Sequence, residues 1–246
     1  QMCIRDSSSS SSSSSVVALT FASNFSGSNN TTLEGGSFGG YSGGNLDGWW
    51  CSNSNSYCGG GLNTDAGSDR YYYYHVAPAN TSAVYTGVYV MAPGVTTLSG
   101  DVSGLNVSGK SKFTFTFGQN TEWFSSAEKN FGVLLTMSKS YANNCRIRLW
   151  QVVTPSSEAD TSYSVNLSDF QILVDSSHDV PDCGSGLTVS EVIAQQSVAQ
   201  IDFKANGGDT RYLNTTGARE GANLTVANTD GFYPTTIVIK GPLKFE

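Results

Sequence analysis

Strict alternation of apolar and polar side chains is the feature of this sequence that most constrains its fold. Residues 112–117, KFTFTF, alternate phenylalanine with lysine or threonine. Residues 146–153, RIRLWQVV, place mainly aliphatic side chains on one face and two arginines with a tryptophan on the other. Because successive side chains of a strand point to opposite faces, both stretches predict strands with one buried face.

Other short stretches have the same strand character and are separated by Gly, Pro and Asn. Residues 24–47 are rich in Gly, Ser and Asn without periodicity, so we expect a loop there. Short strands divided by turn signals predict an all-β jelly-roll sandwich over residues 16–176. The further strands expected in this region cover residues 16–21, 71–76, 84–91, 98–102, 132–137 and 163–174.

The pattern changes after Cys183. Residues 187–196, LTVSEVIAQQ, predict a helix capped at Thr188 or Ser190. Strands are expected at residues 199–204, 222–226 and 235–239. Residues 184–246 therefore form either a small C-terminal extension with one helix and a few strands, or extra strands that complete the sandwich.

Charge and composition limit the class of partner. Only 13% of the residues are charged, 27 are Gly, and the net charge is -7 with 13 basic residues. Nucleic-acid binding is not expected, because phosphate neutralisation needs clustered Lys and Arg. No stretch reaches the roughly 18 apolar residues of a membrane span. The composition is that of a secreted or cell-surface β-protein.

The N-terminal residues need separate treatment. Residues 1–7, QMCIRDS, equal the translation of a transposon end used in sequencing libraries, so we exclude them and expect a metagenomic fragment. Residues 8–15 are serine only and are expected to form a flexible linker. Without Cys3 four cysteines remain, which suits two disulfides in an oxidising compartment. The expected pairs are Cys51 with Cys58 and Cys145 with Cys183, with the other connectivities left open.

Residues 163–174, YSVNLSDFQILV, resemble the closing strand of jelly-roll carbohydrate-binding modules of secreted bacterial proteins. The polyserine stretch is similar to tethers that join such modules to an enzyme, or that follow the lipid anchor of a surface lipoprotein. The resemblance implies a polysaccharide partner, a missing upstream module or lipid anchor, and a binding sheet or loop rim that carries aromatic, Arg, Asn and Gln side chains. Structural calcium is common in these modules.

Sugar binding also follows from the residues themselves. A sugar ring has an apolar face that fits an aromatic plane and hydroxyls that need directional donors and acceptors. The alternative is that Trp150 caps the edge of the core while the arginines are solvated. The expected ligand residues on the strands are Arg146, Arg148, Trp150 and Gln171, with Tyr72 or Tyr74 as neighbours.

Two loops are further candidates. One carries Trp49, Trp50 and Tyr57 beside the expected disulfide loop, and one of the tryptophans is expected to be exposed for a ligand. The other alternates oxygen-bearing side chains, which favours a hard cation such as calcium. No other cofactor is expected. The candidate metal ligands are Asn63, Asp65 and Asp69.

Evidence for catalysis is weaker. Glu158 and Asp160 match two positions of a Glu-x-Asp-x-x-Glu glucanase motif, but Tyr163 stands at the third. Residues 203–207, FKANG, are similar to a segment of alginate lyases, without that family's arginine-rich strand or strand histidine. We therefore expect non-catalytic polysaccharide binding. A structural or adhesive surface domain, and a lyase or hydrolase with an unrecognised site, are the alternatives.

Overall fold

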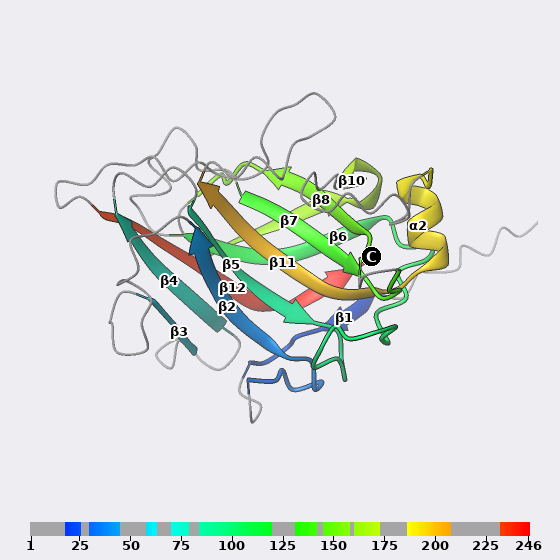
Figure 1. Ribbon diagram of the computed structural model, residues 1–246, viewed down its shortest axis with the longest axis horizontal. Helices are drawn as coiled ribbons and strands as arrows, with labels where there is room; N and C mark the ends of the chain where they lie inside the picture. Colours follow the sequence, from blue (N-terminus) through cyan, green and yellow to red (C-terminus); the bar gives the residue numbers. More distant parts are fainter. Residues whose placement is uncertain are drawn as a thin grey trace, which may run out of the picture.

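The protein folds as a β-sandwich of two antiparallel sheets with one short α-helix at one end (Figure 1). The computed structural model describes residues 18–25, 30–44, 58–62, 70–78, 84–119, 131–141, 145–157, 160–172, 186–207 and 232–246. The predicted all-β sandwich is thus confirmed, whereas the jelly-roll order of connections stays a prediction.

The first sheet, here called the β12 sheet, has the strand order β3-β4-β12-β6-β9, and β1 also pairs with β12. Its strands are β1 (Leu19–Phe21), β3 (Cys58–Leu62), β4 (Arg70–Pro78), β6 (Lys112–Gln119), β9 (Thr161–Asn166) and β12 (Phe232–Phe245).

The second sheet, here called the β11 sheet, has the strand order β10-β8-β7-β11-β5-β2. Its strands are β2 (Phe38–Gly44), β5 (Val84–Met91), β7 (Phe131–Met137), β8 (Arg148–Val153), β10 (Gln171–Ile172) and β11 (Val198–Gly207).

Aromatic side chains from both sheets form the core. Phe113, Phe115 and Phe117 of β6 are at most 1% exposed, which confirms the face predicted from their alternation. The Phe117 and Phe131 rings stack with centroids 3.8 Å apart, and Phe203 of β11 contacts all three β6 rings. Each fully buried ring of this kind contributes about 1.5 to 3 kcal/mol of apolar transfer free energy.

The C-terminal residues are integral to the sandwich. Strand β11 lies between β5 and β7, and β12 lies between β4 and β6. The view of residues 184–246 as an extension is therefore corrected, and the other alternative, completion of the sandwich, describes these strands. The physical reason is pairing across long sequence separations, which no local pattern encodes.

Two expectations about local structure were wrong. Residues 38–44 form strand β2 rather than loop, because β2 pairs along its whole length with β5. Gly39 suits this position, since a Cβ there would lie 2.9 Å from the Tyr89 hydroxyl. Residues 98–102 contain no strand and form bends instead.

The predicted helix is confirmed as α2 (Val189–Gln195). Thr188 is its N-cap, and the Glu191 carboxylate accepts hydrogen bonds from the Thr188 backbone N–H and hydroxyl, both 2.8 Å. This reciprocal capping box stabilises the first turn. No helix in the described part of the chain is long and apolar enough to cross a membrane.

Strand β12 has an irregularity that matters for the surface of its sheet. Lys240 lies opposite Thr116 and Lys244 opposite Thr114, so the register shifts between the two lysines. Gly241 lies in this bulge, and a Cβ there would come within 2.0 Å of the Ala22 carbonyl oxygen. Only glycine permits that approach of the two backbones.

Candidate functional site

A row of side chains crosses the β11 sheet on the face turned away from the core. The registers place Gly39 opposite Tyr89, Tyr89 opposite Asp202, and Asp202 opposite Leu134. The row continues through Trp150 to Gln171 at the edge strand β10. Because residues directly opposite each other in a sheet share a face, this row spans all six strands.

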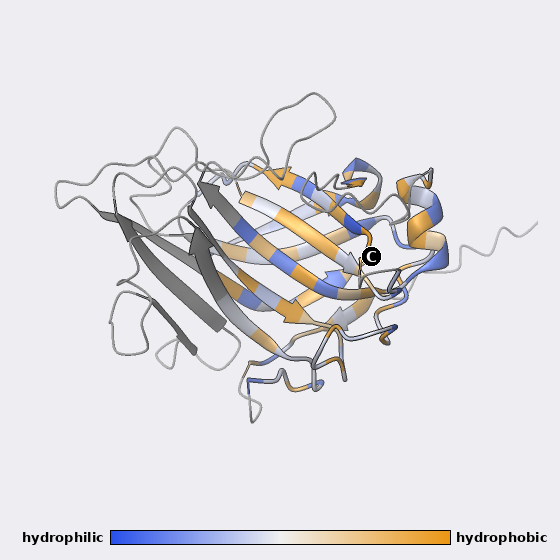
Figure 2. Ribbon diagram, viewed as in Figure 1, coloured by the Kyte–Doolittle hydropathy of each residue, from blue (hydrophilic) through white to orange (hydrophobic). Residues whose placement is uncertain are grey.

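Two neighbouring rows complete this surface, which we call the β11 face. One row places Gln200 between Met91 and Thr136, with Arg148 opposite Thr136. The other places Lys204 between Gly87 and Gly132. The alternation along β11 is visible in Figure 2, where hydrophilic and hydrophobic residues follow one another. The residues of β11 that alternate with these and face the core are Ile201 and Phe203, both at most 1% exposed.

The centre of the β11 face is polar and yet buried. Asp202 is 6% exposed, and Lys204 and Thr136 are each 4% exposed, although none of them faces the apolar core. The Gln200 side-chain amide donates to both Asp202 carboxylate oxygens, at 3.0 and 2.9 Å. Burial of a charged group costs free energy unless it is hydrogen-bonded. The bonded carboxylate is therefore held in one orientation.

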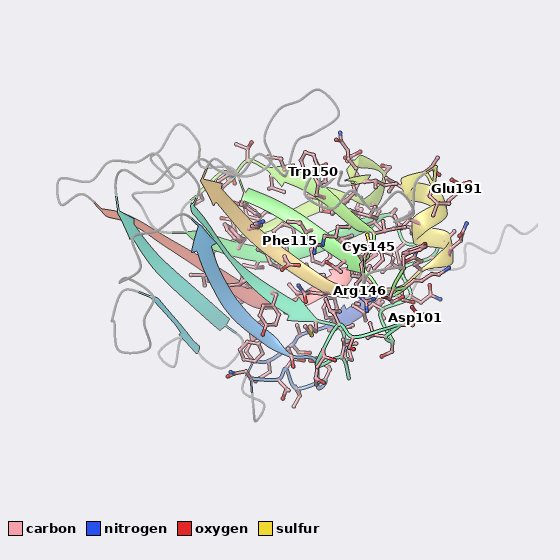
Figure 3. All side chains as sticks on the ribbon, viewed as in Figure 1. Asp101, Phe115, Cys145, Arg146, Trp150 and Glu191 are labelled. Atoms are coloured by element: carbon pink, nitrogen blue, oxygen red, sulfur yellow. The ribbon has the colours of Figure 1, made fainter. Side chains whose placement is uncertain are left out.

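Trp150 lies on this face but does not offer an open ring. It is 4% exposed and forms a small apolar cluster with Leu134 and Val152, separate from the main core. Ile147 and Leu149 face the main core, as expected. The structure corrects the expectation of an exposed Trp150 platform and agrees with the alternative, in which the indole is packed. Figure 3 shows Trp150 well away from Arg146.

Tyr89 is the half-buried aromatic residue of the same row. Its ring lies over Gly39 of β2, because three of its outer ring and hydroxyl atoms are within about 3 Å of the Cβ position there. A ring lying over a glycine keeps its other side turned away from the sheet. Tyr89 is therefore a partly exposed aromatic side chain on the face where the sequence had predicted an exposed Trp150.

The two arginines of the predicted ligand strand have different roles. Arg146 donates to the carbonyl oxygens of Ser138 (2.6 Å) and Met137 (3.3 Å), and also to that of Gly100. Burial lowers the pKa of its guanidinium, and the nearby Asp101 carboxylate acts in the opposite direction. Arg146 thus ties chain segments together at one end of the sandwich, which corrects its assignment as a ligand residue (Figure 3).

Arg148 keeps its predicted place. It is half-buried, and it lies on the β11 face opposite Thr136, two residues from Trp150. Gln171 is exposed and lies opposite Trp150 on the edge strand. The structure therefore brings Arg148 and Gln171 together on one face with Tyr89, Gln200 and the buried charges.

Tyr72 and Tyr74 are not neighbours of these residues. Both lie on β4 of the β12 sheet, where they pair in register with Val238 and Thr236 of β12. Their expected position beside Arg148 is wrong, because β4 and β8 belong to different sheets. The other predicted ligand and metal residues lie outside the described residues: Trp49, Trp50, Tyr57, Asn63, Asp65 and Asp69.

The expected disulfides involve four cysteines, of which Cys145 is half-buried and disulfide-bonded. Cys51 and Cys183 lie outside the described residues, and Cys58 contributes its backbone to β3 opposite His75. Both pairings stay predictions. In the described part of the chain no three His, Cys, Asp or Glu residues group as metal ligands do.

The polar residues of β11 were not predicted as site residues, although the sequence contains a pattern that indicates them. In residues 199–204, AQIDFK, Gln200, Asp202 and Lys204 alternate with apolar residues as the arginines of β8 do. The stretch was predicted as a strand, but its polar face was not recognised as a possible site. What local sequence could not give was its place at the centre of the sheet, between Tyr89 and Arg148.

Comparisons with known proteins add no relative. No protein-family model matches the chain, no curated protein is significantly similar to it, and no solved structure is significantly similar to its fold. Function is therefore inferred from the geometry of the β11 face.

Proposed function

We propose that the protein is a polysaccharide-binding module and that the β11 face is its ligand surface. The observation that carries this proposal is the buried polar row on the side of the sheet opposite the core. An ordinary solvent face would expose its charges, whereas here Asp202 is fixed by Gln200 and almost fully enclosed. Buried groups fixed in this way support the more exposed side chains beside them in set positions, which suits a ligand rich in hydroxyls.

The more exposed residues of the face supply the remaining contacts. Tyr89 presents an aromatic ring, Arg148 a planar set of donors, and Gln171 both a donor and an acceptor. An aromatic plane beside such groups is the combination that a sugar ring needs. The proposed ligand lies across the strands, with Tyr89 towards one edge of the sheet and Gln171 at the other.

Retention on insoluble polysaccharides tests the proposal. Wild type should bind at least one member of a panel that includes cellulose, xylan, chitin and insoluble β-glucan. Arg148→Ala should weaken that binding about tenfold, which corresponds to the loss of one hydrogen-bonded charged group. Tyr89→Ala should weaken it similarly, whereas Tyr89→Phe keeps the ring and should retain most of the affinity.

Folding must be checked by the unfolding midpoint of each variant. Thr188→Ser at the start of α2, outside both sheet faces, is the control and should bind as wild type does. If folded wild type is retained on no member of the panel, or if Arg148→Ala and Tyr89→Ala bind normally, the β11 face is not a glycan site.

A second candidate is acid-base chemistry on the same face, and one observation favours it. Asp202, Lys204 and Tyr89 occupy neighbouring positions, so an amine and a phenol adjoin a carboxyl group. Hydrolysis of glycosides ordinarily uses two carboxylates, and Asp202 is the one carboxylate at the described positions of this face. Release of new reducing ends or unsaturated products from the bound polysaccharide would establish this candidate.

A further inference from the structure

The outer face of the β12 sheet differs in chemistry from the β11 face. Its outward positions on β6 are Lys112, Thr114 and Thr116, because the phenylalanines between them face the core. The outward positions of β9 are Ser162, Ser164 and Asn166, which are all exposed. On these two strands the outward side chains are small and hydroxylic or amidic, apart from one lysine. We call this surface the β12 face.

The bulge in β12 concentrates positive charge on this surface. Lys240 and Lys244 are four residues apart, yet they lie opposite Thr116 and Thr114, which are only two residues apart. Both lysines are half-buried and point outward, since Ile239, Leu243 and Phe245 face the core. Neighbouring rows of a sheet therefore each carry one lysine beside threonine and serine.

The two rows can be followed through the registers. One runs from Thr20 of β1 through Lys244 and Thr114 to Ser164. The other runs from Lys240 through Thr116 to Ser162, where the two hydroxyls are 3.2 Å apart. The register of β4 adds Arg70 opposite Lys240.

Negative charge at the described positions lies at both ends of β9, since Asp160 directly precedes this strand and Asp169 follows it. Glu246 exchanges two backbone hydrogen bonds with Lys112 and lies at the same end of the face as Asp169. Asp169 accepts a hydrogen bond from Asn166 in the same region. Lys244 and Lys240 lie in the rows between these two ends, on a chain whose net charge is -7.

We propose that the β12 face is a second binding surface, and that it binds an anionic polysaccharide whose repeating units carry carboxylate groups. Charge complementarity selects the sign of the ligand, since ammonium groups attract anions as point charges. Hydroxyl side chains beside each lysine bond the sugar hydroxyls. Their small size leaves a low surface along which an extended polymer lies. The proposal does not depend on the function proposed for the β11 face.

Binding of polygalacturonate to immobilised full-length protein tests the inference. Wild type should bind at low salt and lose affinity as the salt concentration rises, because exposed charges are screened. Lys244→Gln and Lys240→Gln should each weaken binding about fivefold, a typical effect of one lysine near an anionic surface. Lys244→Arg keeps the charge and should bind nearly as wild type does.

Three controls keep the location and the ligand distinct. Lys139→Gln removes one positive charge outside this face and should bind polygalacturonate as wild type does. If it loses as much affinity as Lys244→Gln, the effect comes from the net charge of the protein and the proposal is overturned. Neutral dextran should not bind. Binding to phosphatidylserine vesicles in place of polygalacturonate would identify a membrane surface as the partner, which also overturns it.

The double variant Arg148→Ala, Gln171→Ala shows which face binds which polysaccharide. It should lose the neutral polysaccharide found in the panel and keep polygalacturonate. If instead this variant loses polygalacturonate while the lysine variants keep it, the acidic polymer binds the β11 face and the β12 face is not a binding surface.

Discussion

The two outer faces of this sandwich show how one architecture supports different surfaces. At the centre of the β11 face polar side chains are buried, and the Asp202 carboxylate is bonded to Gln200. On the β12 face the polar side chains occupy exposed or half-buried positions, as Ser164 and Lys244 do. In the first arrangement the same buried polar groups stabilise the fold and support the proposed ligand residues, so a change in them should alter both binding and stability. The second leaves stability largely independent of the residues that meet a partner.

Trp150→Ala should give the largest difference between the faces. Loss of this packed ring beside Leu134 leaves a cavity and should lower the free energy of unfolding by about 3 to 5 kcal/mol. Thr116→Ala on the β12 face should change it by about 1 kcal/mol or less. Urea unfolding measures both, and Trp150→Phe serves as the conservative control. Equal effects of the two alanine variants would contradict the contrast.

A pair of double-mutant cycles should show the same contrast more finely. Gln200 and Asp202 should couple by about 1 to 3 kcal/mol, because two hydrogen bonds join the half-buried amide to the buried carboxylate. Thr116 and Ser162 form an exposed pair and should couple by about 0.2 to 1 kcal/mol. Unfolding free energies of the single and double alanine variants give both values. A coupling near zero on the β11 face would show that Gln200 does not hold the carboxylate.

Substitution of Arg146 should mainly lower the stability of the protein, and substitution of Arg148 should mainly lower its affinity for the polysaccharide. Arg146→Ala removes donors from three carbonyl groups and should cost about 1 to 2 kcal/mol. Arg148→Ala should cost about 0.5 kcal/mol or less and should impair retention on the polysaccharide. Arg146→Lys retains one donor group and should be intermediate in stability. Loss of retention in Arg146→Ala at a temperature where it is fully folded would assign that arginine to the ligand.

The smallest effect should come from α2, which belongs to neither face. Hydrogen bonds from the Thr188 N–H and hydroxyl lower the pKa of Glu191. A lowered folded-state pKa means that the stabilisation is present above the ordinary glutamate pKa and is lost as pH falls through the lowered value. The stability gap between wild type and Thr188→Ala should therefore narrow in acid. Thr188→Ser keeps the cap, and neither variant should alter binding to either face.

What the sequence predicted well depends on short-range patterns. The buried phenylalanines of β6 follow from period-two alternation, and the start of α2 follows from Thr188 with Glu191 three residues later. The core side of β8 followed in the same way. The β11 face was predicted in part, through Arg148 and Gln171.

What escaped prediction depends on contacts between distant segments. The glycine-rich β2 has no strand signature of its own and is fixed by pairing with β5. The burial of Trp150 depends on its packing against Leu134 of the neighbouring strand and Val152, and the role of Arg146 depends on carbonyl groups of other segments. The position of Tyr89 beside Asp202 required the order of the strands.

The central place of β11 and β12 also bears on how the protein is made. During synthesis, β4, β5, β6 and β7 leave the ribosome before the two strands that will pair with them. Until then a nascent chain carries strand edges whose N–H and carbonyl groups have not found their final partners, and such edges invite association with other chains. A pairing scheme with large sequence separation also slows folding. Translation arrest before residue 198 should therefore yield chains that need chaperones to stay monomeric.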